Sequence, residues 1–248
     1  MRLQDKVALV TGAGLGFGEG IAKRYAAEGA KVLVADIDGA RAERVAGEIG
    51  GAARPVSADV ANGAEFARMV EDALAAFGRL DVVVNNAGIT HRNGPMLEVD
   101  EATYERVFAV NVKSIYWSAM HAVPVFRRQG GGCFVNIAST AGLRPRPGLT
   151  WYNGSKGAVI AISKSMAVEL APDRIRVNAL CPVIGETGLT AEFMGGDSPE
   201  LRARFVATIP LGRMSRPSDV AAACVFLASD EAEFFTGVAL EVDGGRCV

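Results

Sequence analysis

The chain has 248 residues, of which 50% are hydrophobic, and its formal net charge is −2. One α/β domain can hold the whole chain and bury a large core. Because the 26 lysines and arginines are scattered, the composition argues against nucleic acid or an anionic membrane surface as a partner. We also expect a cytoplasmic protein, since no apolar run reaches membrane length and no export signal precedes the first predicted strand.

The cysteines and histidines are too few and too widely spaced for a metal site. No C-x-x-C pair occurs, and neither histidine adjoins a cysteine. We therefore expect reduced thiols and no metal in the chemistry. This applies to Cys133, Cys181, Cys224 and Cys247, and to His91 and His121.

Short β-branched runs alternate with helical patterns along the whole chain. These runs are apolar on consecutive positions, which is typical of strands buried on both faces. Amphipathic segments such as residues 64–78 lie between them and supply one helix per crossover. The pattern predicts a single α/β domain over residues 1–248, a Rossmann-type, doubly wound parallel sheet with helices on both faces. Its seven strands are expected at residues 6–10, 31–36, 53–60, 80–88, 133–139, 175–182 and 238–245.

A glycine-rich turn, "TGAGLGFGEG", directly follows the first predicted strand. It fits the spacing T-G-x-x-x-G-x-G through Gly12, Gly16 and Gly18, although a strict G-x-G-x-x-G does not fit. A turn without side chains lets backbone amides and a helix N-terminus face a pyrophosphate. No G-K-[ST] follows, which excludes a P-loop. We predict a dinucleotide site here, although glycines also serve helix–sheet packing.

The second predicted strand ends at Asp36, twenty residues after Gly16. An acid at this point accepts hydrogen bonds from an adenosine ribose and repels a 2′-phosphate. Since no lysine or arginine lies inside the glycine turn or next to Asp36 in the sequence, NAD is favoured over NADP. Asp36 can also cap the following helix. Asp59, at the end of the third strand, is either an adenine contact or a solvated acid.

Tyr152 and Lys156 lie four residues apart on one predicted helix, and hence on the same face. A free tyrosine has a pKa of about 10. A neighbouring ammonium, together with the positive charge of an oxidised nicotinamide, favours the phenolate. We therefore expect these charges to lower the pKa of Tyr152 and make it a usable base.

Residues 183–213 interrupt the alternation after the sixth predicted strand. They hold two short helical patterns around a "GGDSP" break. An insertion beyond the carboxyl end of a strand lies where ligands bind in open α/β sheets. We predict that this segment is a substrate lid.

Taken together, several motifs resemble those of the classical short-chain dehydrogenase/reductase (SDR) family: "TGAGLGFG", "NNAG" at residues 85–88, Asn111, Ser139 and "YNGSK" at residues 152–156. The resemblance extends over the whole chain, to "LEVDGG" at residues 240–245. It implies hydride transfer between a nicotinamide and a small secondary alcohol or its carbonyl, and a homotetramer. It also implies a catalytic tetrad of Asn111, Ser139, Tyr152 and Lys156.

Within the tetrad, the resemblance implies that Tyr152 is the general acid/base and that Ser139 polarises the substrate oxygen. Lys156 would bind the nicotinamide ribose, and Asn111 would hold a water that links Lys156 to solvent. The expected cofactor contacts are Gly12, Leu15, Gly16, Phe17, Gly18, Asp36, Ile37, Asp59, Val60, Asn86, Ala87, Gly88, Tyr152, Lys156, Pro182, Ile184 and Thr187. The expected substrate contacts are His91, Ala141, Leu143, Leu149 and Glu186, with Arg92 and Arg144 as further candidates.

Two positions depart from the family pattern. Val183 stands where a glycine is usual, and valine cannot reach the positive φ open to glycine, so the nicotinamide contacts there can shift. Trp151 replaces a small residue before the tyrosine, where it either narrows the substrate site or packs at a subunit contact.

Other functions remain open at this point. One is a 3-oxoacyl-[acyl-carrier-protein] reductase using NADPH, with Arg127, Arg128 and Arg174 as a patch for the acidic carrier. Arginines at helix ends also have a simpler role in dipole compensation. An NAD-sensing regulator usually loses the Tyr or Lys, and a Rossmann-like transferase would leave "YNGSK" and "NNAG" without a role.

Overall fold

The computed structural model describes residues 1–186, 188 and 190–248, and a seven-stranded sheet forms its centre. The strand order is β3-β2-β1-β4-β5-β6-β7, and every pairing is parallel. The predicted doubly wound sheet is therefore confirmed. The strands are β1 (Val7–Thr11), β2 (Lys31–Asp36), β3 (Ala53–Ser57), β4 (Val82–Asn85), β5 (Gly132–Ile137), β6 (Ile175–Pro182) and β7 (Ala239–Val242).

Helices connect the strands and cover both faces of the sheet. The α-helices are α1 (Gly16–Ala27), α2 (Gly39–Ile49), α3 (Gly63–Phe77), α4 (Glu101–Phe108), α5 (Ser114–Gln129), α6 (Thr150–Leu170), α7 (Thr190–Met194), α8 (Pro199–Val206) and α9 (Pro217–Ala228). Single turns of 3₁₀ helix are η1 (Met96–Glu98), η3 (Thr140–Gly142), η4 (Ala171–Asp173) and η5 (Asp230–Ala232), and η2 (Ala109–Lys113) is a π-helix.

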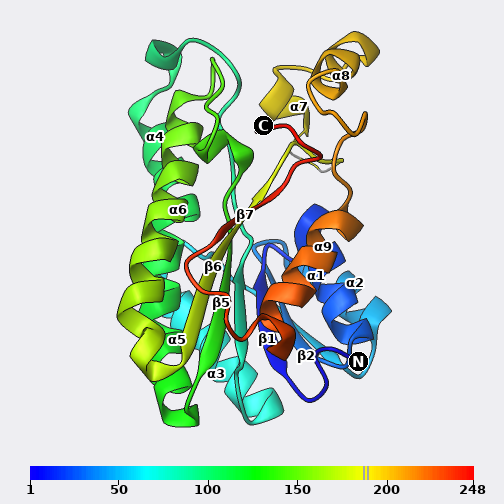
Figure 1. Ribbon diagram of the computed structural model, residues 1–248. Helices are drawn as coiled ribbons and strands as arrows, with labels where there is room; N and C mark the ends of the chain where they lie inside the picture. Colours follow the sequence, from blue (N-terminus) through cyan, green and yellow to red (C-terminus); the bar gives the residue numbers. More distant parts are fainter. Residues whose placement is uncertain (187, 189) are drawn as a thin grey trace.

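Helices lie on both faces of the sheet (Figure 1), and each face buries its own apolar cluster. On one face α1, α2 and α9 pack against alternate residues of β1 such as Ala8 and Val10. On the other face α3, α5 and the end of α6 pack against Leu9 and Leu33. This two-sided burial explains why the strands read as continuous apolar runs rather than alternating ones. No described helix is long and apolar enough to cross a membrane.

The strand order reverses between β1 and β4, which are neighbours in the sheet. Their crossovers leave toward opposite sides, so a crevice opens at their carboxyl ends. β4 ends at Asn85, three residues earlier than predicted, because the Asn86 and Ala87 N–H groups bond to the Thr11 hydroxyl at 3.1 Å each. The end of β4 is thereby fixed against the glycine turn that follows β1.

Candidate active site

The glycine turn after β1 is built to exclude side chains. Gly12 and Gly16 both adopt φ of +60°, and a Cβ on Gly18 would lie 2.1 Å from the Gly12 carbonyl oxygen. The Asn86 side chain donates to the carbonyls of Thr11 and Gly12 at 2.8 and 3.0 Å, which fixes the turn from β4. Leu15 caps α1 without a side-chain hydrogen bond. The first amides of α1 are thus open to an anionic ligand, which fits a pyrophosphate.

Asp36 lies beside this turn and fits a ribose-binding role. Its Oδ2 accepts from the Gly14 N–H at 2.8 Å and its Oδ1 from the Asp38 N–H at 3.0 Å. Arg41 lines the same cleft, and its Nε pairs with Asp38 Oδ2 at 2.9 Å. The sequence does not indicate this arginine as a cleft residue, because it comes close to Asp36 only through the fold of α2.

Asp59 also lines the cleft and is ion-paired. Its Oδ2 lies 2.9 Å from Arg106 Nη1, and its Oδ1 accepts from the Ala61 N–H at 2.9 Å. Arg106 is a second cleft residue that the sequence analysis missed, since α4 lies far from β3 along the chain.

One continuous cleft collects most of the predicted cofactor residues. It runs from Asp36 past the glycine turn to Ser139, Tyr152 and Lys156. Gly18 lies behind the turn, Asn111 lies behind the cleft wall, and the predicted contact Thr187 is outside the described residues. The predicted residues in the cleft lining are Gly12, Leu15, Gly16, Phe17, Asp36, Ile37, Asp59, Val60, Asn86, Ala87, Gly88, Pro182 and Ile184, besides the three at its end.

Burial is the largest cause of the pKa shifts of both Tyr152 and Lys156. Lys156 is 5% exposed, its Nζ donates to the Ile137 carbonyl at 2.7 Å, and the same Nζ lies 5.9 Å from the Tyr152 ring centroid. Burial lowers the pKa of Lys156 to about 8. Burial also raises the pKa of Tyr152 to about 12, with a hydrogen bond to Ser139 acting in the opposite direction. Burial thus outweighs the ammonium within this pair, and the lowering of the Tyr152 pKa by ammonium and nicotinamide together stays a prediction.

Asn111 lies in the π-helical turn η2, between α4 and α5. Its Oδ1 accepts from the Ile89 N–H at 2.9 Å, and its Nδ2 donates to the Ile89 carbonyl at 2.9 Å and the Ser155 hydroxyl at 3.0 Å. A Cβ on Gly88 would lie 3.3 Å from both Asn111 Oδ1 and Lys156 Nζ. Asn111 therefore ties the strand-4 loop to α6 next to Lys156, and π-turns of this kind frequently mark functional sites.

Ser139 stands at the carboxyl end of β5, next to Tyr152. Its Oγ accepts from the Ala141 N–H at 3.1 Å and so caps the turn η3. The cap bond uses the Ser139 oxygen as an acceptor, so the hydroxyl proton can donate to the Tyr152 oxygen or to a substrate oxygen.

The structure does not bring the predicted substrate residues to this cleft. Ala141 and Leu149 are 2% and 0% exposed and belong to the packing beneath α6. His91 lines a neighbouring hollow with Arg92 and Glu192, while Leu143 and Glu186 face solvent. The lining beside Tyr152 comes instead from Gly188, Thr190 and Phe193 of the predicted lid segment. Phe193 meets the Tyr152 ring edge-on, with centroids 5.6 Å apart.

The two departures from the family pattern have local explanations. Val183 is 3% exposed and its N–H donates to the Val242 carbonyl at 3.2 Å, in a conformation without positive φ. A glycine is therefore not required there. The Trp151 indole N–H donates to the Met96 carbonyl at 3.1 Å, and the ring packs edge-on against Tyr104. Within the described chain, Trp151 anchors the start of α6 to η1 and α4.

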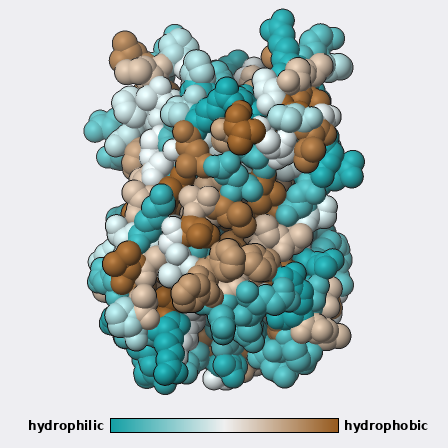
Figure 2. Space-filling view, in the orientation of Figure 1, coloured by the Kyte–Doolittle hydropathy of each residue, from teal (hydrophilic) through white to brown (hydrophobic). Residues whose placement is uncertain are grey.

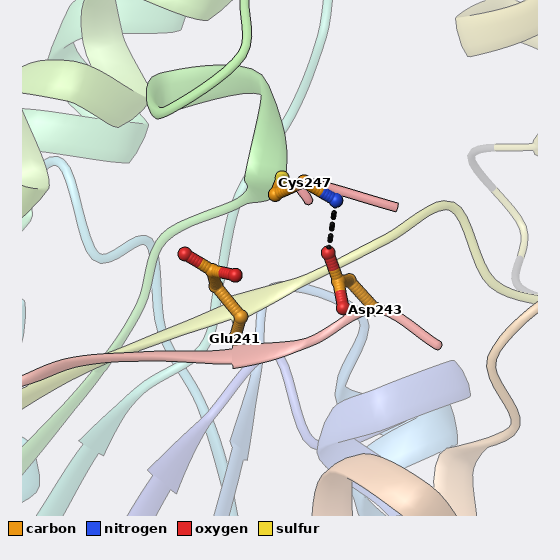
Figure 3. A group of neighbouring side chains, drawn as sticks. All are labelled: Glu241, Asp243 and Cys247. Carbon is orange, nitrogen blue, oxygen red and sulfur yellow. Dashed lines mark hydrogen bonds between the residues drawn. The ribbon is translucent and has the colours of Figure 1, made fainter. Parts of the chain in front are cut away.

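Glu241, Asp243 and Cys247 place three metal-ligating atoms within 4.8 Å of one another (Figure 3). The two Asp243 oxygens accept from the Gly245 and Cys247 N–H groups at 2.9 and 2.7 Å. Burial and the neighbouring Asp243 raise the pKa of the Cys247 thiol to about 11, so it stays protonated at neutral pH. The group is thus organised as a turn that holds the end of the chain.

The chain is similar to known proteins over nearly its whole length. A family model described as enoyl-(acyl carrier protein) reductase matches residues 12–246. The chain is 53% identical to 4-formylbenzenesulfonate dehydrogenase TsaC1/TsaC2 of Comamonas testosteroni, over 99% of each chain. It is 38% identical to 2-(S)-hydroxypropyl-CoM dehydrogenase 3 of Xanthobacter autotrophicus, over 98% of this chain and 97% of that one.

A solved structure is also similar over the full length. It is the 3-ketoacyl-(acyl-carrier-protein) reductase of Brucella melitensis, complexed with NADH. The TM-score is 0.95 and the sequence identity 48%, covering 99% of this chain and 100% of that one.

Proposed function

The chain belongs to the short-chain dehydrogenase/reductase family and is an oxidoreductase acting on CH–OH groups; on that premise we propose that it uses NAD to interconvert a secondary alcohol and its carbonyl. Sugars, polyols and other hydroxy compounds are the proposed substrates. The observation that carries this proposal is the single cleft that has Asp36 at one end and Ser139, Tyr152 and Lys156 at the other.

The bound nicotinamide supplies the hydride acceptor or donor, and the chain's own residues supply the proton. Tyr152 takes the hydroxyl proton during oxidation and returns it during reduction. The Ser139 hydroxyl donates to the substrate oxygen and orients it toward Tyr152. Because burial raises the pKa of Tyr152 to about 12, the phenol is protonated at neutral pH and carries the proton that reduction of a carbonyl consumes. In oxidation, the positive charge of the nicotinamide favours the phenolate and offsets this burial.

Lys156 and Asn111 serve as supports in this proposal. Lys156 is fixed by the Ile137 carbonyl and faces Gly88, where it can bind the nicotinamide ribose. Asn111 holds the loop at Ile89 against α6. As the family resemblance implies, it would also hold a water that links Lys156 to solvent. Segment 183–213 acts as a lid, because Phe193 covers the Tyr152 ring.

Asp36 supports NAD as the cofactor. Its carboxylate lies beside the glycine turn, where a 2′-phosphate would meet a like charge. Arg41 is the counter-argument, since it lines the same part of the cleft, but its guanidinium is already paired with Asp38. We further propose a cytoplasmic homotetramer that acts on a small molecule and not on nucleic acid or a membrane.

A 3-oxoacyl-[acyl-carrier-protein] reductase using NADPH is the second candidate. The 48% identity to a 3-ketoacyl-(acyl-carrier-protein) reductase supports it. Its basic patch is weakened in this chain, because Arg127 Nε pairs with Asp173 at 2.8 Å. Asp36 opposes it as well, since this alternative relies on NADPH.

The test is absorbance at the NADH band with purified protein, supplied separately with NAD and with NADP. The panel spans sugars, polyols, hydroxy acids, aryl carbinols with their carbonyls and β-ketoacyl thioesters. Turnover of a hydroxy compound with NAD supports the proposal. Turnover confined to β-ketoacyl thioesters with NADPH would replace it with the second candidate.

A further inference from the structure

Three arginines gather where the loop before α6, the lid and the end of the chain meet. Arg144 and Arg146 come from the loop between η3 and α6, and Arg246 follows the turn held by Asp243. The Arg144 guanidinium donates to the Arg246 carbonyl at 2.6 Å, which joins the loop to the chain end. Figure 1 shows the chain end, α7 and this loop at the same end of the molecule.

This group, Arg144, Arg146 and Arg246, has no carboxylate partner among the described residues. Other arginines of the chain do find acids, as Arg2, Arg44, Arg79, Arg106, Arg202 and Arg213 show. Both carboxylate oxygens of the nearby Asp243 accept hydrogen bonds from backbone N–H groups. Arg246 Nε is buried without a hydrogen-bond partner. Burial, together with the charges of Arg246 and Arg144, lowers the pKa of Arg146 to about 10.

For the partly buried Arg146, a charge beside two like charges and without an acid is unfavourable, and a bound anion would offset this. The loop also fixes the arginines in place, because Pro145 and Pro147 follow Arg144 and Arg146 and restrict the backbone. The Arg146 carbonyl accepts from Asn153 Nδ2 at 2.8 Å, directly beside Tyr152 in the sequence. Such prior ordering reduces the entropy lost on binding a ligand.

A row of aromatic rings connects this group to the proposed catalytic centre. The Arg146 guanidinium carbon lies 4.6 Å from the Phe205 ring centroid on α8. Phe205 is 6.3 Å from Phe193, which in turn is 5.6 Å from Tyr152. A flat apolar body can lie along these rings, with its reacting carbon at Tyr152 and its far end at the arginines.

We propose that Arg146, with Arg144 and Arg246, binds a carboxylate or sulfonate at the far end of an aromatic hydroxy or carbonyl substrate. This inference rests on the proposed function and narrows its substrate class. The anion replaces the missing acid partner, and the aromatic body packs on Phe193 and Phe205. A planar guanidinium suits such oxyanions, because it donates two parallel hydrogen bonds.

The experiment compares reduction by NADH of two matched carbonyl pairs. These are 4-formylbenzoate with its methyl ester, and 4-acetylbenzoate with its methyl ester. Each ester keeps the ring and the reacting carbon and removes only the charge. We expect the wild type to prefer the anions in kcat/KM, and Arg146→Gln to reduce that preference at least about tenfold, mainly through KM.

Arg204→Gln is the matched control. Arg204 is an exposed arginine next to Phe205 on α8. Its substitution removes one positive charge from the same region and leaves Arg144, Arg146 and Arg246 unchanged. It should keep the anion preference. Sulfate gives a test on the wild type alone: it should inhibit reduction of the acids competitively and leave the esters nearly unaffected.

The outcomes separate the inference from the proposed function. If acids and esters react equally in the wild type, or if Arg146→Gln keeps the preference, the inference is wrong while the proposed function stands. If sulfate inhibits acids and esters equally, it acts outside this group and the inference also fails. If no member of the wider panel is turned over with either cofactor, the proposed function fails and the inference with it.

Discussion

At the level of single residues, burial and neighbours decide the chemistry more than residue type does. Tyr152 and Lys156 lie on one helix face, as predicted, yet burial raises the pKa of the one to about 12 and lowers that of the other to about 8. The pair therefore needs a positive charge close to Tyr152 before it can act as a base near neutral pH. In the proposed function that charge comes with the oxidised nicotinamide.

Asp36→Ala tests the residue that the NAD proposal depends on. Removing the carboxylate removes the repulsion of a 2′-phosphate and leaves Arg41 as the nearest charge in that part of the cleft. We expect the ratio of kcat/KM with NADP to that with NAD to rise at least about tenfold. Steady-state kinetics with both cofactors measures it, and an unchanged ratio would show that Asp36 does not face the ribose.

Sequence motifs identified the backbone-defined parts of the site and missed the side-chain pairs. The turn after β1 requires residues that adopt a positive φ, which made Gly12 and Gly16 predictable. The end of β2 next to this turn made Asp36 predictable. Arg41 and Arg106 enter the cleft from α2 and α4, through ion pairs that exist only after folding. Among the predicted substrate contacts, Leu149 lies outside the cleft lining because it is fully buried at the start of α6.

At the level of elements, ion pairs tie the first two helices together. Glu19 on α1 accepts from Arg44 on α2 at 2.8 Å and from Lys23 at 2.6 Å. The hydrogen bond from Arg44, followed by that from Lys23, lowers the pKa of Glu19 from 4.5 to about 2. This link holds α2 beside the glycine turn, because Arg44 also donates to the Gly14 carbonyl at 3.0 Å.

Glu19→Gln should destabilise the protein by about 1 kcal/mol at pH 7, since both basic partners are partly exposed and screened. A carboxylate whose pKa is lower when folded contributes stability above its unfolded pKa of 4.5, and loses it as the pH falls toward 2. The difference between wild type and variant should therefore shrink below about pH 4.5. Urea unfolding at pH 7 and pH 4 measures this, and a constant difference would contradict the assignment.

The element pattern was largely predictable, and element ends were not. The predicted bounds of β2 and β6 are those observed. β4 is shorter than predicted, because Asn86 bonds to Thr11 of β1 instead of continuing the strand. Its N–H donates to the Thr11 hydroxyl and its side-chain amide to the Thr11 carbonyl. The π-turn at Asn111 has no sequence signal at all and depends on contacts with Ile89 and Ser155.

At the level of the whole molecule, exposed apolar side chains bear on assembly. Figure 2 shows apolar side chains gathered across the middle of the face on which β7 lies. Val168 on α6 is 80% exposed, and Phe234 and Phe235 before β7 are 99% and 42% exposed. The apolar side chains of α9, by contrast, are largely buried against α1. Exposed apolar groups of this kind fit the proposed homotetramer.

Val168→Glu places a charge at an exposed apolar position of α6 and should shift the protein toward smaller species. Glu169→Gln, at the exposed neighbouring position, is the control and should leave the mass unchanged. Sedimentation equilibrium at one protein concentration compares the two variants with the wild type. A wild type that sediments as a monomer would overturn the homotetramer, and an unaffected Val168→Glu tetramer would move the interface elsewhere.

The central claim is that Tyr152 transfers the proton in a nicotinamide-dependent oxidation of a hydroxy compound. The most direct measurement is single-turnover formation of NADH by wild type and Tyr152→Phe, at saturating NAD and the best substrate of the panel. The account predicts NADH formation at least about a hundredfold slower in Tyr152→Phe, with NAD binding near normal. NADH formation at the wild-type rate in that variant would remove Tyr152 from the chemistry and contradict the account.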